Sequence, residues 1–193
     1  MRSSLKATVL AVGLLLPLAA CKQERAETAP PPPAAITADA IGHYCGMNLH
    51  DHPGPKGQVI VKDAPRPIWL SSVRDTFAFT MLPEEPKEIR AIYVTDMTGV
   101  TDSQKPNFDA WVEARQAWYV LDSGAKGGMG ASEPLPFATE AAARAFAAKA
   151  GGKVKRFTEV TDDEILTLDI EPAPHPAGHA ADTPAHATHG ATP

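Results

Sequence analysis

The chain has few cysteines, few aromatic residues and no surplus of basic charge. Two cysteines in 193 residues are too few for a disulfide scaffold. A formal net charge of −5 argues against nucleic-acid binding through a basic face. No apolar run reaches the length of about 18 residues that a membrane-spanning helix needs. The 44% of hydrophobic residues still suffices for the core of one ordinary domain.

The first 21 residues have the features of a bacterial lipoprotein signal. Residues 1–6 are short and cationic, and the apolar stretch 7–20 is too short to span a bilayer. This stretch ends in Leu18-Ala19-Ala20-Cys21, which resembles a lipobox. The alternative is an ordinary signal peptide in which Cys21 is incidental.

We therefore expect a signal peptide over residues 1–20 and a lipid anchor on Cys21, with the mature protein facing the periplasm. Lys22 stands where an aspartate often retains such lipoproteins in the inner membrane, and this favours the outer membrane. Several acyl chains on one cysteine would give stable anchoring.

Two segments rich in proline and alanine flank the part of the chain that we expect to fold. Residues 21–38 are predicted to be a lipidated tether that holds the domain off the membrane. Residues 172–193 contain five prolines and four histidines but no large apolar residue, so we expect this tail to be disordered. The predicted domain therefore covers residues 39–171.

Within that domain, the residue pattern predicts the order strand, helix, strand twice. The predicted strands are residues 58–62, 88–95, 116–121 and 153–158. An apolar stripe predicts the first helix, and Pro83 would end it; its residues are Trp69, Val73, Phe77 and Met81. The second helix is predicted over 138–150, with Thr139 as N-cap and Gly151-Gly152 as its end. Residues 162–170 close the domain. We predict an α+β fold of two similar halves that share one core.

Residues 42–54 concentrate donors for a soft metal ion. They hold Cys45 and Met47 together with His50, His52 and the less favoured His43. Thiolate and thioether ligands favour Cu(I) over harder divalent ions. A glycine between Cys45 and Met47 allows a tight bend that aims both sulfurs at one ion. The competing interpretation is that Cys45 and Met47 are packing residues and that the histidines are exposed loop residues.

Two methionines outside this segment are further candidates. Met129 lies between glycines in Gly127-Gly128-Met129-Gly130, where core packing explains it poorly, so we consider it a third sulfur ligand. Met97 follows the strand predicted at 88–95 and is a less favoured ligand. Met81 belongs to the helix stripe and is assigned to the core. The tail histidines could bind metal weakly, namely His175, His179, His186 and His189.

No hydrolase, metalloprotease or phosphate-binding motif is present, so we do not predict an enzyme. One alternative is a thiol-dependent enzyme resembling an organomercurial lyase, but such chemistry would want more than one thiol near the metal. Lipidation of Cys21 would leave only Cys45. A structural lipoprotein without metal is the other alternative.

Several motifs in order resemble the NosL family, lipoproteins that assist the assembly of nitrous-oxide reductase. These motifs are the lipobox, CGMNLHDHPGPKGQV, YVTDM and SGAKGGMGASEPLPF, followed by an alanine-rich helix and GGKV. The resemblance implies two ββαβ-type halves, similar to part of an organomercurial lyase fold. It also implies a periplasm-facing Cu(I) chaperone that delivers copper to maturing reductase.

In this resemblance the family's Cys-Gly-Met falls on Cys45 and Met47, and its Gly-Met-Gly loop falls on Met129. The partners it implies are an ABC-type membrane complex of the maturation machinery and the reductase itself. The histidine-rich tail is not part of the family pattern.

Overall fold

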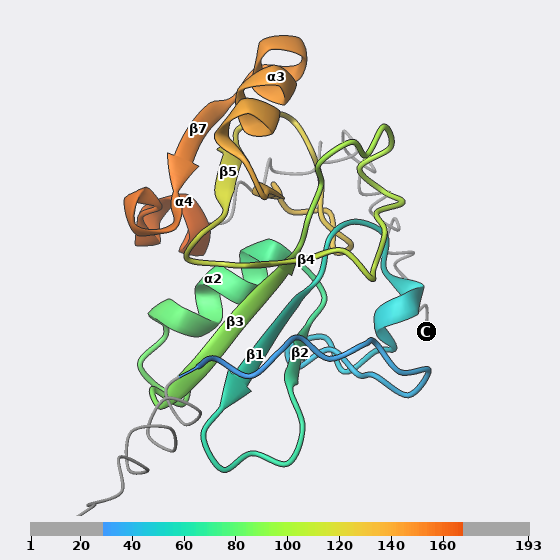
Figure 1. Cartoon of the computed structure of the whole chain (residues 1–193), viewed down its shortest axis with the longest axis vertical. Helices are drawn as coiled ribbons and strands as arrows, with labels where there is room; N and C mark the ends of the chain where they lie inside the picture. Colours follow the sequence, from blue (N-terminus) through green and yellow to red (C-terminus); the bar gives the residue numbers. More distant parts are fainter. Residues whose placement is uncertain (1–28, 168–193) are drawn as a thin grey trace, which may run out of the picture.

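Two antiparallel sheets, each with its own helix, make up residues 29–167, the part of the chain that the computed structural model describes (Figure 1). The predicted signal peptide, Cys21 and the tail 172–193 lie outside the described residues. Among residues 29–167, none of the helices has the length and apolar character needed to cross a membrane.

The first half runs in the order strand, strand, helix, strand. Its elements are β1 (Gly57–Val61), β2 (Ile68–Leu70), α2 (Val73–Met81) and β3 (Ile89–Thr95), and β4 (Trp111–Glu113) extends the sheet to the order β2-β1-β3-β4. Helix α2 packs against β1 and β2. The predicted ββαβ-type half is therefore present, with one extra edge strand.

The second half repeats this order. Its elements are β5 (Trp118–Leu121), β6 (Leu135–Phe137), α3 (Glu140–Ala150) and β7 (Lys153–Arg156), with strand order β6-β5-β7. A 3₁₀ helix η2 (Phe157–Glu159) and helix α4 (Asp162–Leu166) follow, and α4 packs against α2 of the first half. In both halves the first strand lies between the other two, which confirms the predicted α+β fold of two similar halves.

The ends of both long helices follow from their sequences. Helix α2 begins after Ser72, whose side chain accepts a hydrogen bond from the Asp75 amide, so Trp69 belongs to β2 and not to the helix as predicted. Thr139 caps α3 as expected, and Gly151 ends it at a φ of 82°. A glycine adopts this left-handed conformation without steric cost.

The main core draws on both halves. Phe77 of α2 contacts Tyr119 of β5 and Phe157 of η2, with ring centroids 4.8 Å apart in each pair. Met81 is partly buried against this cluster, as expected. A second, smaller cluster lies beneath α3; its buried members are Met97, Val120, Leu135, Phe137 and Ala143. The predicted single core is thus a shared main core with two smaller clusters, the second of them formed by Ala40, Leu49 and Trp69.

Residues 31–38, the N-terminal strap, cross the face of the first sheet opposite α2 (Figure 1). The Gln58 side chain is fully buried and bonds both backbone groups of Ala34, at 2.8 Å to its N–H and 3.0 Å to its carbonyl. The Tyr93 hydroxyl donates to the Pro31 carbonyl at 2.7 Å. Residues 31–38, which the sequence analysis assigned to the tether over 21–38, therefore pack against the sheet.

Candidate metal centre

Cys45 and Met47 lie in a tight hairpin formed by residues 41–48, the Cys45 hairpin. The Gly42 amide donates to the Met47 carbonyl and the Gly46 amide donates to the Gly42 carbonyl, both at 2.9 Å. Gly46 has a φ of 66°, a conformation that a side chain would strain. Cys45 is partly exposed and Met47 is exposed. The predicted bend between the two sulfur residues is present.

The segment that follows buries one of the candidate histidines. The Asn48 side chain caps the 3₁₀ helix η1 (Leu49–Asp51) by accepting from the His50 amide. The His50 side chain is exposed, whereas His52 is 7% exposed and its Nε2 has no hydrogen-bond partner among residues 29–167. Nearly all buried polar atoms in proteins have a partner, so an unpaired imidazole nitrogen at this position is available to a ligand.

Met129 lies in a second hairpin formed by residues 126–132, the Met129 hairpin, in the connection between β5 and β6. A bridge between Lys126 and Ser132 closes it, and the Gly130 amide donates to the Gly127 carbonyl at 2.9 Å. The Met129 side chain is 59% exposed. As the sequence predicts, this methionine does not pack in the core.

The loop that carries His52 and the Met129 hairpin are in direct contact. A Cβ atom added at Gly128 would lie 2.7 Å from Cβ of His52, so only glycine permits this approach. Gly54 likewise lies against the backbone of Lys126 and Gly127. The structure therefore places the unpaired His52 ring directly against the residue that precedes Met129.

Two other candidates have different surroundings. Met97 is 3% exposed inside the second core cluster, and its amide donates to the Pro136 carbonyl, so it is a packing residue and not the free loop residue expected from the sequence. The His43 ring lies 3.1 Å from Glu85 and packs edge-on against Phe79.

Two buried charged residues that the sequence analysis did not single out lie beside these loops. Lys56 is fully buried, and its ammonium group donates to the carbonyls of Pro53 at 2.9 Å and Gly54 at 2.6 Å. Glu133 is 3% exposed and accepts a hydrogen bond from the Val73 amide at 2.6 Å. The sequence could have pointed to both residues, because Lys56 lies in the motif CGMNLHDHPGPKGQV and Glu133 lies in the motif SGAKGGMGASEPLPF.

Burial shifts the pKa of both groups towards the neutral form. It lowers the pKa of Lys56 to about 8, against the opposing effect of Glu133, Cys45 and Asp75. Burial raises the pKa of Glu133 to about 8, and the hydrogen bond from Val73 opposes that shift. The Lys56 ammonium group is thus within electrostatic range of both Cys45 and Glu133.

Residues 29–167 contain no group of three or more His, Cys, Asp or Glu side chains that could hold one metal ion. The donors on the two hairpins and the intervening loop are instead one thiol, two thioethers and one unpaired imidazole. Sulfur-rich sets with imidazole are typical of proteins that bind a soft metal ion.

Comparison with known proteins identifies the family. The sequence model of the NosL family matches residues 33–165. The chain is 41% identical over 169 residues to the copper-binding lipoprotein NosL of Achromobacter cycloclastes, a match that covers 86% of each chain. It is 33% identical over 184 residues to the copper-binding lipoprotein NosL of Stutzerimonas stutzeri, covering 95% of this chain and 91% of the relative.

The fold is also that of a solved relative. The crystal structure of the copper chaperone NosL from Shewanella denitrificans matches with a TM-score of 0.62 and 36% identity, over 68% of this chain and 98% of that chain. The chain belongs to the NosL family.

Proposed function

We propose that this chain is a lipid-anchored Cu(I) carrier that binds the ion where its two halves meet. The observation that carries the proposal is the buried His52 ring with its unpaired Nε2, held directly against the hairpin of Met129. Cys45 would supply the anionic soft ligand, and Met129 with Met47 or His52 would supply neutral donors. The names of the two curated relatives, both copper-binding lipoproteins, support copper as the cargo.

The exposure of these donors suits transfer of an ion better than permanent storage. Met47 and Met129 are among the large apolar side chains that the described surface exposes. An acceptor's sulfur or imidazole can therefore join the ion before a bond to the donor protein breaks. The ion stays Cu(I) throughout such an exchange, so no electron is needed. The chain acts as a carrier and not as an enzyme.

The proposed location is based on the lipobox, and the proposed partners are based on the family resemblance. Lipidation of Cys21 would anchor the protein facing the periplasm, in the outer membrane because Lys22 follows the cysteine. There it would deliver copper to nitrous-oxide reductase during maturation, in contact with an ABC-type membrane complex. Both relatives' names include the word lipoprotein, which supports the anchor.

Metal binding is tested on the mature chain purified without oxygen. Competition against a Cu(I) chelator should show about one tightly bound Cu(I) per chain, with weak competition by Zn(II). Deletion of residues 172–193 should leave this tight site intact. Stoichiometric zinc with no copper would refute the proposal.

Delivery is tested in cells. A strain without this protein should make nitrous-oxide reductase with a reduced copper content, and the wild-type gene should restore it. A Cys21→Ser variant should lose its acyl label and leave the membrane fraction. Reductase with its full copper content in the deletion strain would separate copper binding from the proposed destination.

A further inference from the structure

The buried Lys56 side chain hydrogen-bonds the backbone of the loop that carries His52. Its ammonium group bonds the carbonyls of Pro53 and Gly54, the two residues that directly follow His52, and lies 5.3 Å from the centre of the Phe108 ring. Burying a charged group is costly unless it is hydrogen-bonded. An apolar side chain would fill this space at a lower cost, but it would leave both carbonyls without a donor.

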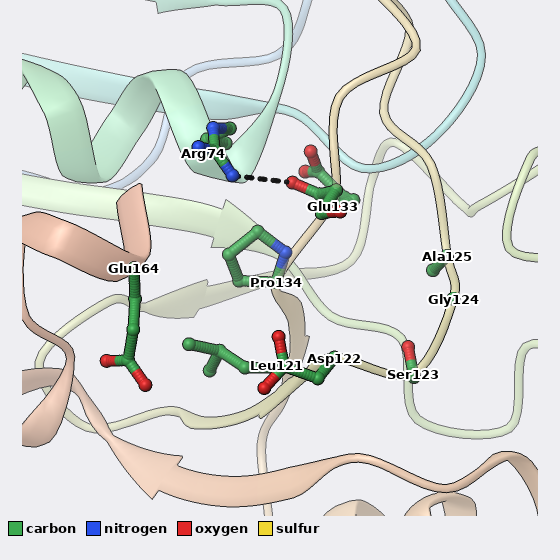
Figure 2. A pocket seen from close by; sticks show the side chains of 10 residues that line it. Arg74, Leu121, Asp122, Ser123, Gly124, Ala125, Glu133, Pro134 and Glu164 are labelled. Carbon is green, nitrogen blue, oxygen red and sulfur yellow. Dashed lines mark hydrogen bonds between the residues drawn. The ribbon is translucent and has the colours of Figure 1, made fainter. Parts of the chain in front are cut away.

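Glu133, the residue that follows the Met129 hairpin, is hydrogen-bonded to the start of α2. One carboxyl oxygen accepts from the Val73 amide in the first turn of the helix. The other oxygen is buried without a partner in the described part of the chain and faces Gly127, where an added Cβ would overlap it. Arg74 of the same helix donates to the Ser132 carbonyl at 3.3 Å, beside a small cavity that Glu133 also lines (Figure 2).

The same helix start also borders the Cys45 hairpin. A Cβ added at Gly42 would lie 2.6 Å from the Cys45 sulfur and 3.5 Å from Cβ of Ser71, which lies between β2 and α2. Glu133 and Cys45 each act to raise the pKa of Lys56, against the effect of its burial. Lys56 therefore bonds the His52 loop, Glu133 bonds the start of α2 beside the Met129 hairpin, and neither residue is itself a candidate ligand.

We propose that Lys56 and Glu133 are positioning residues that fix the spacing between the His52 loop and the Met129 hairpin, so that donors from both halves reach one Cu(I) ion. This proposal rests on the proposed function. It assigns a role in copper binding to two residues that do not touch the ion. Residues that orient metal ligands without binding the metal themselves typically contribute about 10–100-fold to metal affinity.

The test compares Lys56→Met and Glu133→Gln with the same substitutions at a second lysine and glutamate, which bond neither the His52 loop nor the Met129 hairpin. Lys155 and Glu164 form an ion pair in the second half, 2.5 Å apart and less buried than Lys56 and Glu133, so Lys155→Met and Glu164→Gln serve as controls. For each full mature chain, the dissociation constant of Cu(I) is measured by chelator competition, well below its melting temperature. X-ray absorption of the loaded protein gives the number and type of donor atoms bound to copper.

Lys56→Met and Glu133→Gln should each weaken Cu(I) binding by about 10–100-fold and change the donor set. The controls should remain within about twofold of wild type. The double variant should lose less than the product of the single losses, because both residues act on the same spacing. Should Lys56→Met fail to fold, Glu133→Gln alone decides the outcome.

Lower melting temperatures with unchanged affinity and an unchanged donor set would overturn the proposal, since the two residues would then only stabilise the fold. A wild-type chain that binds no Cu(I) would instead refute the proposed function. The two failures are therefore distinguishable in one experiment.

Discussion

The two halves of the domain share a strand order but carry their candidate ligands in different places. In the first half the Cys45 hairpin and the His52 loop precede β1, whereas in the second half the Met129 hairpin connects β5 to β6. The first sheet is also covered by the N-terminal strap on the face opposite α2. The repeated unit thus forms the framework, and the segments that carry the candidate ligands are attached to it at non-equivalent positions.

The sharpest contrast lies between the two loop methionines, Met97 and Met129. Met97→Ala should lower the free energy of unfolding by about 2–5 kcal/mol, because its side chain is buried in the second core cluster. Met129→Ala should change it by less than about 0.5 kcal/mol, because the side chain is exposed. Urea unfolding measures both values. Equal losses of stability in the two variants would contradict the division into core and site.

Substituting the two sheet side chains that bond the strap tests whether the first half depends on this extra segment. Gln58→Leu removes both hydrogen bonds to Ala34 and leaves two backbone groups unpaired, which should cost about 1–3 kcal/mol. Tyr93→Phe removes only the bond to Pro31 and should cost about 0.5–1.5 kcal/mol. Chemical denaturation gives both values, and hydrogen exchange at the Ala34 amide should quicken in Gln58→Leu. Wild-type stability in both variants would mean that the strap does not stabilise the sheet.

Matched glycine substitutions compare the two hairpins directly. Gly46 and Gly130 have φ values of 66° and 82°, and neither has an atom close enough to obstruct a methyl group. Gly46→Ala and Gly130→Ala should therefore each cost only the strain of a left-handed residue, about 1–2 kcal/mol. Thermal unfolding measures this cost. A much larger loss in one hairpin would show that its turn is tied to the core.

The sequence predicted the longer elements because their patterns extend over enough residues. Thr139 and Gly151-Gly152 marked the ends of α3 correctly, and the β-branched run in β1 marked a strand. The predicted helix stripe wrongly included Trp69, because Trp69 and Val73 are four residues apart, as on one face of a helix. The helix in fact begins after its N-cap Ser72, and Trp69 lies in β2. Strands β2, β4 and β6 have three residues each, too few for an alternating pattern to show.

The candidate ligands could be named from the sequence, but their surroundings could not. Donor chemistry pointed to Cys45, Met47 and Met129, and the Gly46 bend followed from the glycine itself. The burial of Met97 and the unpaired ring of His52 depend on contacts between distant segments. The same is true of the partners of Lys56 and Glu133, since hydropathy alone predicts that lysine and glutamate are exposed.

The central claim is that one Cu(I) ion is held jointly by the Cys45 hairpin and the Met129 hairpin. Dissociation constants for Cu(I), measured without oxygen by chelator competition on wild type, Cys45→Ser and Met129→Ala, test it most directly. Cys45→Ser should weaken binding most, because it replaces the one anionic soft ligand with a hard alcohol. Met129→Ala should weaken it less but measurably, because a thioether is a neutral donor. Wild-type affinity in Cys45→Ser would contradict the account and place the site elsewhere.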